Sequence, residues 1–358
     1  MKRLVDNLDH VEAKRICVIK PSALGDVIQA TVVLDALRSR FPDASISWVI
    51  KDSLAPLLSH HSQIDEVIPF RTQQGWRMVI PLFRQLRRAK FDLTLDLQGL
   101  FRTAVMTFAT GAPHRVGLQT AREGASLTYN CLVNNTGWDQ SAVGRLWQVA
   151  AALGDHSRKP PEFPAAGLDL TWARQQLASL SGPLLAISPG TRWTSKQWPA
   201  ERFAEIARDT VARFGGSVVI LGADNECELS EVIERAVRQT GGNALNLTGA
   251  TGIPQLGAVL AMSHCLLSND SGAMHLAAAV GTPFVSVFTS TSPQISGPIG
   301  AEGRMIAAST SCAGCYQRRC PLVSSQPPCF GQVDSRLVTA AVGEYLQRAP
   351  NTASRRAS

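Results

Sequence analysis

The stretch SNDSGAMHLAAAVGTPFVSVF, residues 268–288, decides the fold. It is typical of a polar loop, a helix of small residues, a stop at Gly281 and then a buried strand. Asp270 and Ser271 are placed to cap the helix, and Gly272 lets a ligand approach the backbone. The free N–H groups and the positive end of the helix dipole then face the loop. The stretch therefore predicts an anion site, and a nucleotide diphosphate is the expected ligand.

Outside this stretch, short apolar runs alternate with amphipathic ones. Residues 15–20, 45–50, 91–97 and 184–188 predict strands, and residues 27–41 predict one helix with a buried stripe. Strands alternating with helices imply parallel βαβ units. We expect an α/β protein of two Rossmann-like domains that face each other across a cleft. The first covers residues 1–175 and the second 183–332, with the linker in the Pro-rich region 155–182, a C-terminal helix over 333–348 and a disordered tail over 349–358.

Composition narrows the classes of protein. The chain has 358 residues, 45% of them hydrophobic, and no apolar run reaches the roughly 18 residues that span a bilayer. The N-terminus lacks the apolar core of a signal peptide, so the expected location is cytoplasmic. The net charge is +7, and nine Arg or Lys lie between Arg71 and Arg122 against two Asp. This excess suits an anionic membrane surface, an acidic substrate or simply a solvated face. No nucleic-acid reader motif accompanies it, so no nucleic-acid partner is expected.

The segment KPSALGD, residues 20–26, follows the first strand, at the edge where open α/β sheets bind ligands. It has one Gly, so it is neither a dinucleotide fingerprint nor a P-loop. Asp26 begins the next helix. It is either a general base or an acid that the helix dipole favours.

Two loops of the second half carry further candidates. In SPGTRWTSKQWP, residues 188–199, Ser188, Gly190 and Thr191 form a polar turn, and Lys196 either reaches a phosphate or is a surface lysine. In LGADNE, residues 221–226, Glu226 is the first candidate for the ribose hydroxyls and Asp224 the second, although either could be an N-cap. His275 either binds a phosphate or is a buried histidine.

Four of the eight cysteines cluster in CAGCYQRRCPLVSSQPPC, at Cys312, Cys315, Cys320 and Cys329. The spacing is typical of a small structural site for zinc or iron, and unligated thiols are the alternative. Disulfides are not expected in a reducing cytoplasm. No HExxH, EF-hand loop or Asp-x-Asp clamp is present, so Lys196 and helix N–H groups would meet the charge of a leaving diphosphate.

Four segments together resemble glycosyltransferase family 9, the ADP-heptose:lipopolysaccharide heptosyltransferases. They are KPSALGDVIQATVVLDALR, DLQGLFRT, PGTRWTSKQWP and NDSGAMHLAAAVGTPFVSVF, and the resemblance spans about residues 15–345. It implies a GT-B fold whose first domain binds the acceptor and whose second binds the nucleotide sugar. The Cys-rich insert, residues 312–329, is found in only part of the family, including members that modify proteins.

The resemblance gives residues roles. Asp26 matches the general base, and Lys196 matches the phosphate-binding lysine. The resemblance also gives donor-binding roles to Thr191, Asp270, Ser271, Gly272 and His275, beside Ser188, Gly190 and Glu226 from the loops above. For the acceptor, Arg102 and Arg115 match basic positions of the family, and we add Ser22 and Gly25 from the loop before Asp26. Arg192 departs from the second hydroxyl residue that some members carry beside Thr191.

The expected function is inverting, metal-independent transfer of heptose from ADP-heptose to the inner core of lipopolysaccharide. We expect a monomer that acts on a lipopolysaccharide precursor. Because no apolar run can span a bilayer, the expected attachment to the cytoplasmic side of the inner membrane is peripheral, helped by the basic first domain. Two alternatives stay open. One is a transferase of the same fold with another nucleotide sugar or a protein acceptor, and the other is an inactive nucleotide-sugar-binding protein.

Overall fold

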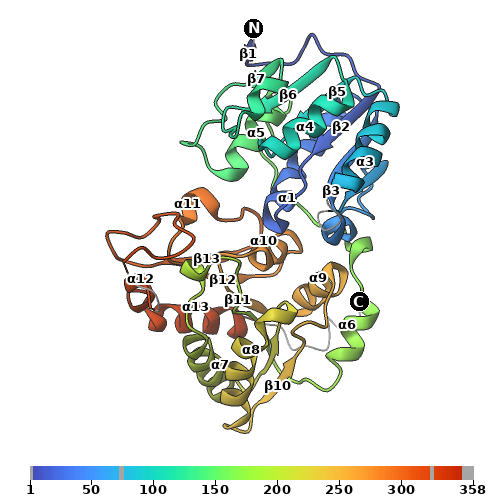
Figure 1. The fold of residues 1–358 in the computed structure, drawn as a ribbon. Helices are drawn as coiled ribbons and strands as arrows, with labels where there is room; N and C mark the ends of the chain where they lie inside the picture. The colour runs from blue at the N-terminus through green and yellow to red at the C-terminus, as the bar shows by residue number, and fades with distance from the viewer. Residues whose placement is uncertain (1–2, 72–75, 323–325, 349–358) are drawn as a thin grey trace. The chain divides into compact units, whose positions relative to one another are not determined.

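Strands form where β-branched and other apolar residues run together, as in SVVI (Ser217–Ile220) and FVSVF (Phe284–Phe288). The computed structural model describes residues 3–71, 76–322 and 326–348. The chain divides into two compact units, Met1–Gly167 and Leu168–Ser358. Each is built around a parallel sheet with helices on its faces (Figure 1).

The sheet of the first unit has the strand order β1-β7-β6-β5-β2-β3-β4 among the described residues, and every pairing in it is parallel. Strand β2 lies inside the sheet, and four of its five residues are buried. The strands are β1 (Arg3–Val5), β2 (Arg15–Ile19), β3 (Ser45–Lys51), β4 (Glu66–Phe70), β5 (Leu93–Asp96), β6 (His114–Leu118) and β7 (Cys131–Val133).

The helices of this unit are α1 (Leu24–Ala30), α2 (Val32–Arg40), α3 (Trp76–Arg88), α4 (Phe101–Thr110) and α5 (Ala142–Ala152). Short 3-10 turns cover Asp52–Leu57, Ala125–Thr128 and Ala165–Gly167. The prediction of a single helix over residues 27–41 is wrong, because the helix is interrupted at Thr31. There the Thr31 hydroxyl and amide both donate to the Ile28 carbonyl, at 2.7 and 3.2 Å, which closes α1.

The second unit repeats the plan with the strand order β10-β9-β8-β11-β12-β13, again all parallel. Its central strands β8, β11 and β12 are buried at every position. The strands are β8 (Leu184–Ser188), β9 (Ser217–Ile220), β10 (Asn243–Asn246), β11 (Cys265–Asn269), β12 (Phe284–Phe288) and β13 (Gly303–Ala307).

The helices of this unit are α6 (Leu170–Gln176), α7 (Ala200–Phe214), α8 (Cys227–Arg238), α9 (Ile253–Met262), α10 (Gly272–Ala279), α11 (Pro293–Ser296), α12 (Pro328–Gly331) and α13 (Ser335–Gln347). Two 3-10 turns cover Thr194–Lys196 and Asp224–Glu226. One core joins the central strands to α7, α8 and α13. Helix α13 belongs to this core, since Val338 and Val342 are fully buried.

Helix α6 also lies in the second unit, although the sequence places residues up to 175 in the first domain. The side chain of Asp169, which precedes it, accepts a hydrogen bond from Gln255 at 2.9 Å, and its amide donates to the Pro254 carbonyl at 3.2 Å. The tail expected over residues 349–358 lies outside the described residues. No helix in the described ranges combines the length and apolarity that a membrane span needs. The α/β class and the two Rossmann-like sheets are confirmed.

Candidate active site

In the first unit, the candidate base stands where the chain leaves β2. Asp26 is the third residue of α1 and is exposed. Its Oδ2 accepts a hydrogen bond from the Ala23 amide at 3.1 Å, so the carboxylate stabilises the first turn of the helix. Ser22 lies in the same loop and its hydroxyl accepts a hydrogen bond from the Arg102 guanidinium at 3.1 Å. Gly25 is buried in the first turn. The structure therefore brings Asp26, Ser22, Gly25 and Arg102 to one edge of the sheet.

Two buried charges lie beneath this loop, and the sequence analysis missed both as site residues. Lys20 is 8% exposed and its ammonium donates to the Leu97 carbonyl at 3.0 Å. Burial lowers the pKa of Lys20, while the negative charges of Asp26 and Asp96 raise it. The Asp96 carboxylate is fully buried and accepts hydrogen bonds from the Tyr129 hydroxyl at 2.6 Å and the Gly99 amide at 3.0 Å. The loop that carries Asp26 thus lies over buried polar groups, Lys20 and Asp96, which connect the ends of β2 and β5.

Burial raises the pKa of Asp96 against the opposing effect of its hydrogen bonds, and burial beside Asp96 also raises the pKa of Tyr129. The sequence signal for these buried polar groups was available. Lys20 opens the segment KPSALGD, and Asp96 opens DLQGLFRT.

Arg115 lies elsewhere. It is the second residue of β6 and pairs with Thr94, two residues before the end of β5. Its guanidinium donates to the carbonyls of Thr128 at 2.7 Å and Ala112 at 2.6 Å. These bonds hold Arg115 toward the loops before the strand, so the structure does not bring it to the edge that carries Asp26.

In the second unit, three loops meet where β8, β11 and β12 end, because these strands are neighbours in the sheet. The Lys196 ammonium donates to Asp270 Oδ2 at 2.7 Å, and the Thr291 hydroxyl donates to the same oxygen at 2.6 Å. The exposed fractions of the Lys196 and Asp270 side chains are 16% and 6%. Lys196 also lies over the Trp193 ring, 4.6 Å from its centre. Lys196 is therefore a partly buried, fixed cation and not a free surface lysine.

Helix α10 begins directly after this ion pair. The expectation that Asp270 or Ser271 caps it is wrong: Ser271 is the N-cap residue but makes no side-chain cap, and the Asp270 carboxylate is bonded to Lys196 and Thr291. The Ser271 hydroxyl is buried and has no hydrogen-bond partner among the described residues. Gly272 is the first helical residue, and His275 lies one turn further and is 8% exposed. The first N–H groups of the helix have no intrahelical acceptor. A hydroxyl without a partner among the described residues and amides without an intrahelical acceptor thus meet at one helix end, beside a lysine.

Asn269 fixes these loops to one another, and the sequence analysis missed it. Its side-chain amide donates to the Pro189 carbonyl at 2.7 Å and accepts from the Trp198 amide at 3.2 Å. Ser188 ends the neighbouring strand β8, is 7% exposed and pairs with Ser268 in the register of β8 and β11. Thr191 follows and is partly exposed. An Asn at the end of an apolar run, directly before Asp270, was the available signal.

Glu226 and not Asp224 faces this edge. The Glu226 carboxylate accepts the Ala223 amide at 2.9 Å and occupies the space that a Cβ on Gly190 would take. Asp224 lies instead against Gly249. The absence of a side chain at Gly190 therefore lets the Glu226 carboxylate approach the loop that follows β8.

The Cys-rich insert touches the same loops through its backbone. The Arg318 carbonyl accepts from the Ser195 amide at 3.4 Å, and the Tyr316 amide donates to the Ser290 carbonyl at 2.7 Å. The Arg318 guanidinium lies 5.8 Å from the Trp193 ring centre, on the ring that Lys196 also contacts. The insert is thus part of the wall that positions Lys196.

The metal prediction for the insert is not supported by the described residues. Within them, no group of three or more His, Cys, Asp or Glu side chains is placed to hold a metal ion. Cys312 and Cys315 are exposed, Cys320 is half-buried and Cys329 is buried. Burial raises the pKa of Cys329, and the nearby thiols of the other three add to the effect. The four thiols are therefore close to one another but are not arranged to coordinate a metal ion. Metal analysis of the purified protein tests the prediction directly.

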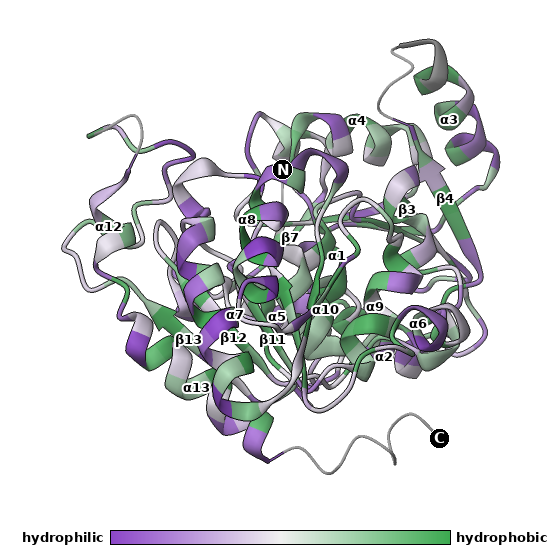
Figure 2. Cartoon of the chain, turned by 90° about the horizontal axis from the view of Figure 1, so that it is seen from below, coloured by the Kyte–Doolittle hydropathy of each residue, from purple (hydrophilic) through white to green (hydrophobic). Residues whose placement is uncertain are grey.

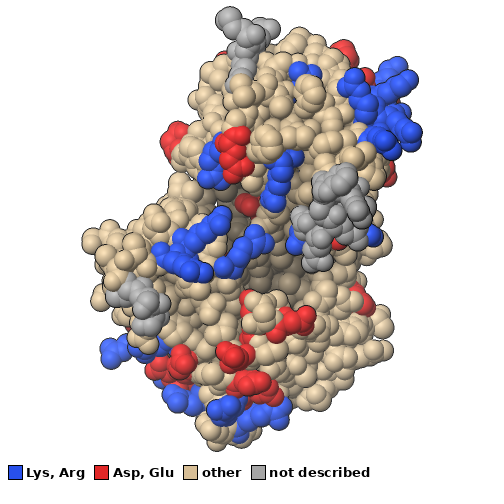
Figure 3. All heavy atoms as spheres, in the orientation of Figure 1, with Lys and Arg blue, Asp and Glu red and all other residues tan. Residues whose placement is uncertain are grey.

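Helix α3 carries a basic face in the first unit. Leu82 and Leu86 are buried in the core, while Arg84, Arg87 and Arg88 are exposed on the other side. Figure 2 shows both hydrophobic and hydrophilic residues on this helix, and Figure 3 shows Lys and Arg gathered over it. None of the three arginines forms an ion pair within the described ranges. Ile80, exposed at 43%, lies one turn before Arg84.

The family model for glycosyltransferase family 9 (heptosyltransferase) matches residues 79–325. The chain is 29% identical to lipopolysaccharide heptosyltransferase 1 of Pseudomonas aeruginosa over 94% of this chain and 99% of that protein. It is 26% identical to the lipopolysaccharide core heptosyltransferase OpsX of Haemophilus influenzae over 80% of this chain and 82% of that one.

Solved structures share the fold. The ADP-heptose lipopolysaccharide heptosyltransferase II of Escherichia coli superposes with a TM-score of 0.76 at 24% identity, covering 93% of this chain and 99% of that one. The E. coli heptosyltransferase WaaC with ADP superposes with a TM-score of 0.70 at 23% identity, covering 92% and 99%. The architecture of the two parallel sheets is therefore GT-B.

Proposed function

Because the chain belongs to glycosyltransferase family 9, it is a glycosyltransferase, and we propose that it transfers heptose from ADP-heptose to the inner core of lipopolysaccharide, with inversion and without a catalytic metal. The main support for the nucleotide-sugar site is the position of Lys196, which its bond to Asp270 holds beside the uncapped N-terminus of α10. A fixed cation, an unpaired hydroxyl and free helix amides match the charge of a diphosphate. The relatives named for heptose transfer to lipopolysaccharide support the sugar and the acceptor.

In the proposed reaction, the Asp26 carboxylate takes the proton from an acceptor hydroxyl as that oxygen attacks the anomeric carbon. The bond from that carbon to the diphosphate breaks on the opposite face, which inverts the configuration. Lys196, the Ser271 hydroxyl and the N–H groups of Gly272 and the residues after it stabilise the charge that develops on the leaving diphosphate. Asp270 accepts from sugar hydroxyls, while Thr191, Ser188, Gly190 and His275 complete the donor loop.

On the acceptor side, Ser22, Gly25 and Arg102 are proposed to receive the substrate, with Arg102 facing an anionic group. We leave Arg115 out of this set because its guanidinium is bonded to carbonyls of its own unit.

The direct test is transfer to defined acceptors. The purified protein is incubated with ADP-heptose and with truncated lipopolysaccharide acceptors in the presence of EDTA, and the products are weighed by mass spectrometry. A mass gain of one heptose, with inverted configuration by NMR, is the expected result. A donor screen and a protein acceptor are run in parallel. Transfer of another sugar, transfer only to protein, or ADP binding with no transfer at all would each overturn the proposal in favour of one of the alternatives.

Glu226 is proposed to bind the ribose hydroxyls of the donor. We expect Glu226→Gln to weaken binding of both ADP and adenosine about tenfold, because one charge-assisted hydrogen bond is lost. Calorimetry of both ligands measures the effect. Asp224→Asn, two residues away and turned toward Gly249, is the matched control and should bind like wild type. If the Asp224 variant loses affinity and the Glu226 variant does not, the ribose assignment moves to Asp224.

The basic face of α3, Arg84, Arg87 and Arg88, is proposed to hold the enzyme at the anionic surface that carries its acceptor, as a peripheral protein. Three charges at about 1 kcal/mol each correspond to roughly a hundredfold in vesicle binding. We therefore expect replacement of all three by Gln to abolish co-sedimentation with vesicles that contain phosphatidylglycerol. The wild-type protein should not co-sediment with vesicles of phosphatidylcholine alone.

The matched control replaces Arg202, Arg208 and Arg213 on the exposed side of α7 by Gln. It removes the same charge from another helix and should leave vesicle binding unchanged. Equal losses in both triple variants would mean that binding follows net charge and that α3 is not the docking face.

A further inference from the structure

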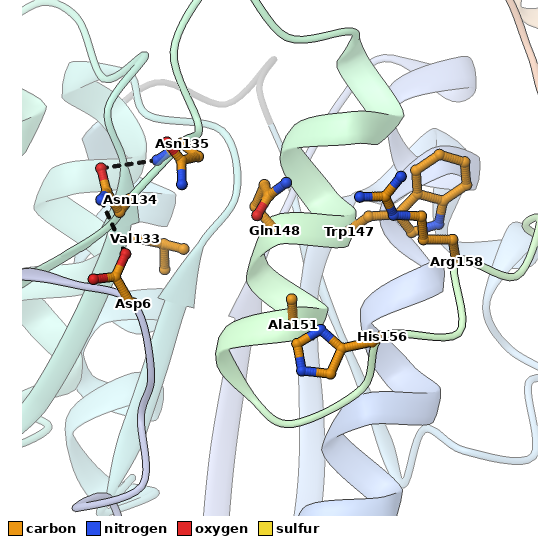
Figure 4. Close-up of a pocket in the computed structure, with 9 residues that line it drawn as sticks. All are labelled: Asp6, Val133, Asn134, Asn135, Trp147, Gln148, Ala151, His156 and Arg158. Atoms are coloured by element: carbon orange, nitrogen blue, oxygen red, sulfur yellow. Dashed lines mark hydrogen bonds between the residues drawn. The ribbon is translucent and has the colours of Figure 1, made fainter.

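A polar pocket of about 220 Å³ lies in the first unit, away from the residues that the proposed reaction uses. Its walls come from two sides (Figure 4). Asp6 and Asn134 follow the ends of β1 and β7, and Asn135 is next in the chain. Gln148 projects from α5, and His156 and Arg158 follow that helix. Val133, Trp147 and Ala151 complete the lining. The pocket is therefore surrounded by amides, one carboxylate, one imidazole and one guanidinium.

One wall of the pocket is fixed by its own hydrogen bonds. The Asn134 amide donates to Asp6 Oδ1 at 2.9 Å, and the Asn135 backbone amide donates to Asn134 Oδ1 at 3.0 Å. This arrangement orients the Asp6 carboxylate through Oδ1, and its second oxygen accepts no hydrogen bond from the described residues. A carboxylate and side-chain amides held this way are suited to receive hydroxyl groups of a small polar ligand.

The opposite wall supplies positive charge. Arg158 and His156 are both exposed at the surface of the pocket. Neither the Arg158 guanidinium nor the Gln148 amide has a hydrogen bond to protein within the described residues. A guanidinium in this position can form a bidentate contact with a carboxylate or phosphate.

The backbone around the pocket is strained at two points. Asn135 and Arg158 have φ values of 54° and 50°, in the left-handed region. Five residues other than glycine adopt positive φ among the described ones, and two of them line this pocket. Such strain costs about 1–3 kcal/mol per residue and gathers at ligand sites. Here it places both side chains on the pocket.

The pocket is connected to the acceptor loop by α5. Arg145 lies on this helix one turn before Gln148, and its charge lowers the pKa of Lys20 beneath that loop. Along the sheet, β6 and β5 separate β7 from β2, which corresponds to about 14 Å at the usual strand spacing. That span exceeds one sugar ring. A ligand in the pocket would thus be a part of the acceptor beyond the sugar that reacts.

We propose that the pocket formed by Asp6, Asn134, Asn135, Gln148, His156 and Arg158 binds an anionic sugar residue of the acceptor, distal to the hydroxyl that is glycosylated. The inference rests on the proposed function for the identity of the acceptor. Its volume is below the ~300–1,000 Å³ of sites for drug-sized ligands, and it suits a single ring. Arg158 faces the carboxylate or phosphate, and Asp6 with the amides faces the ring hydroxyls.

The first test is binding of free sugars, which needs no transfer. Saturation-transfer NMR with glucuronate, glucose 1-phosphate and glucose distinguishes a carboxylate, a phosphate and a neutral ring. We expect wild type to bind at least one of the anionic sugars and not glucose, and Arg158→Gln and Gln148→Ala to lose that signal. Lys159→Gln, which removes the neighbouring charge outside the pocket, should bind like wild type. No signal with wild type, or an equal signal with Arg158→Gln, would overturn the proposal.

The second test is acceptor kinetics. We expect Arg158→Gln to raise KM about tenfold for an acceptor with the distal anionic sugar, with unchanged kcat. KM for an acceptor that lacks this sugar, and for the donor, should stay as in wild type. Equal kinetics of the two proteins on the long acceptor would reject the subsite. If wild type binds the free sugar through Arg158 but transfers no heptose, the proposed function fails while the pocket stands.

Discussion

Asp26→Asn is expected to lower kcat by about 10² to 10⁴, because the acceptor hydroxyl loses the group that takes its proton. Asparagine keeps the size of the side chain and an oxygen that can accept the Ala23 amide, which Asp26 now accepts at 3.1 Å. The first turn of α1 therefore stays intact, and the thermal midpoint should change little. Donor affinity, measured by calorimetry with ADP, should also stay as in wild type. The effect is then confined to the chemical step.

The chain offers a matched control for this variant. Asp35 occupies the first turn of the next helix, α2, and accepts a side-chain hydrogen bond from Gln63. Asp35→Asn makes the same chemical change at the same kind of position and should leave kcat unchanged. Full activity of the Asp26 variant, or an equal loss in both variants, would remove Asp26 from the role of base.

The sequence predicted the parts of the fold that local pattern determines. Runs such as LLAIS and FVSVF are apolar at four of five positions, and all five positions are buried, as in other buried parallel strands. Lys196 lies in the loop after LLAIS, and Asp270 and Ser271 lie in the loop after Cys265–Asn269. They could be named because ligand sites lie at the ends of such strands. The buried strands and the loops that carry site residues were thus predictable without any contact being known.

Contacts between distant residues were not predictable. Lys196 is bonded to a residue 74 positions away, and Tyr129 donates to Asp96 across 33 positions. Only folding brings these groups together, so a lysine that looked equally suited to the surface is in fact held in place. Arg115 is the opposite case, since the resemblance gave it an acceptor role but its bonds to Ala112 and Thr128 were not predictable. The break at Thr31 depends on one hydroxyl turning back to a carbonyl.

Because Lys196 and Asp270 form an ion pair, a loss of activity in a Lys196 variant has two possible explanations. Lys196 is proposed to bind the diphosphate, but it also neutralises a carboxylate whose side chain is 6% exposed. Removing one partner of such a pair leaves a buried charge, which costs about 1–3 kcal/mol of stability. A single variant therefore cannot tell a binding residue from a structural one.

We expect Lys196→Gln to lower kcat/KM for the donor by about 10² to 10³, because the leaving diphosphate loses its fixed cation. The variant should bind ADP much more weakly than wild type and adenosine equally well, since adenosine carries no phosphate. Its thermal midpoint should also fall. Asp270→Asn alone should bind ADP at least as well as wild type, because the substitution removes a negative charge and frees the ammonium from its partner.

The double variant Lys196→Gln with Asp270→Asn decides between the two explanations. It has no unpaired buried carboxylate, so the thermal midpoint should recover most of what Lys196→Gln loses. ADP affinity should remain low, because the double variant regains stability but still lacks the lysine that binds the diphosphate. Recovery of ADP binding together with stability would show that Lys196 acts only through Asp270. A loss of ADP binding in Asp270→Asn as large as in Lys196→Gln would lead to the same conclusion, and the diphosphate would then be held by α10 and Ser271 alone.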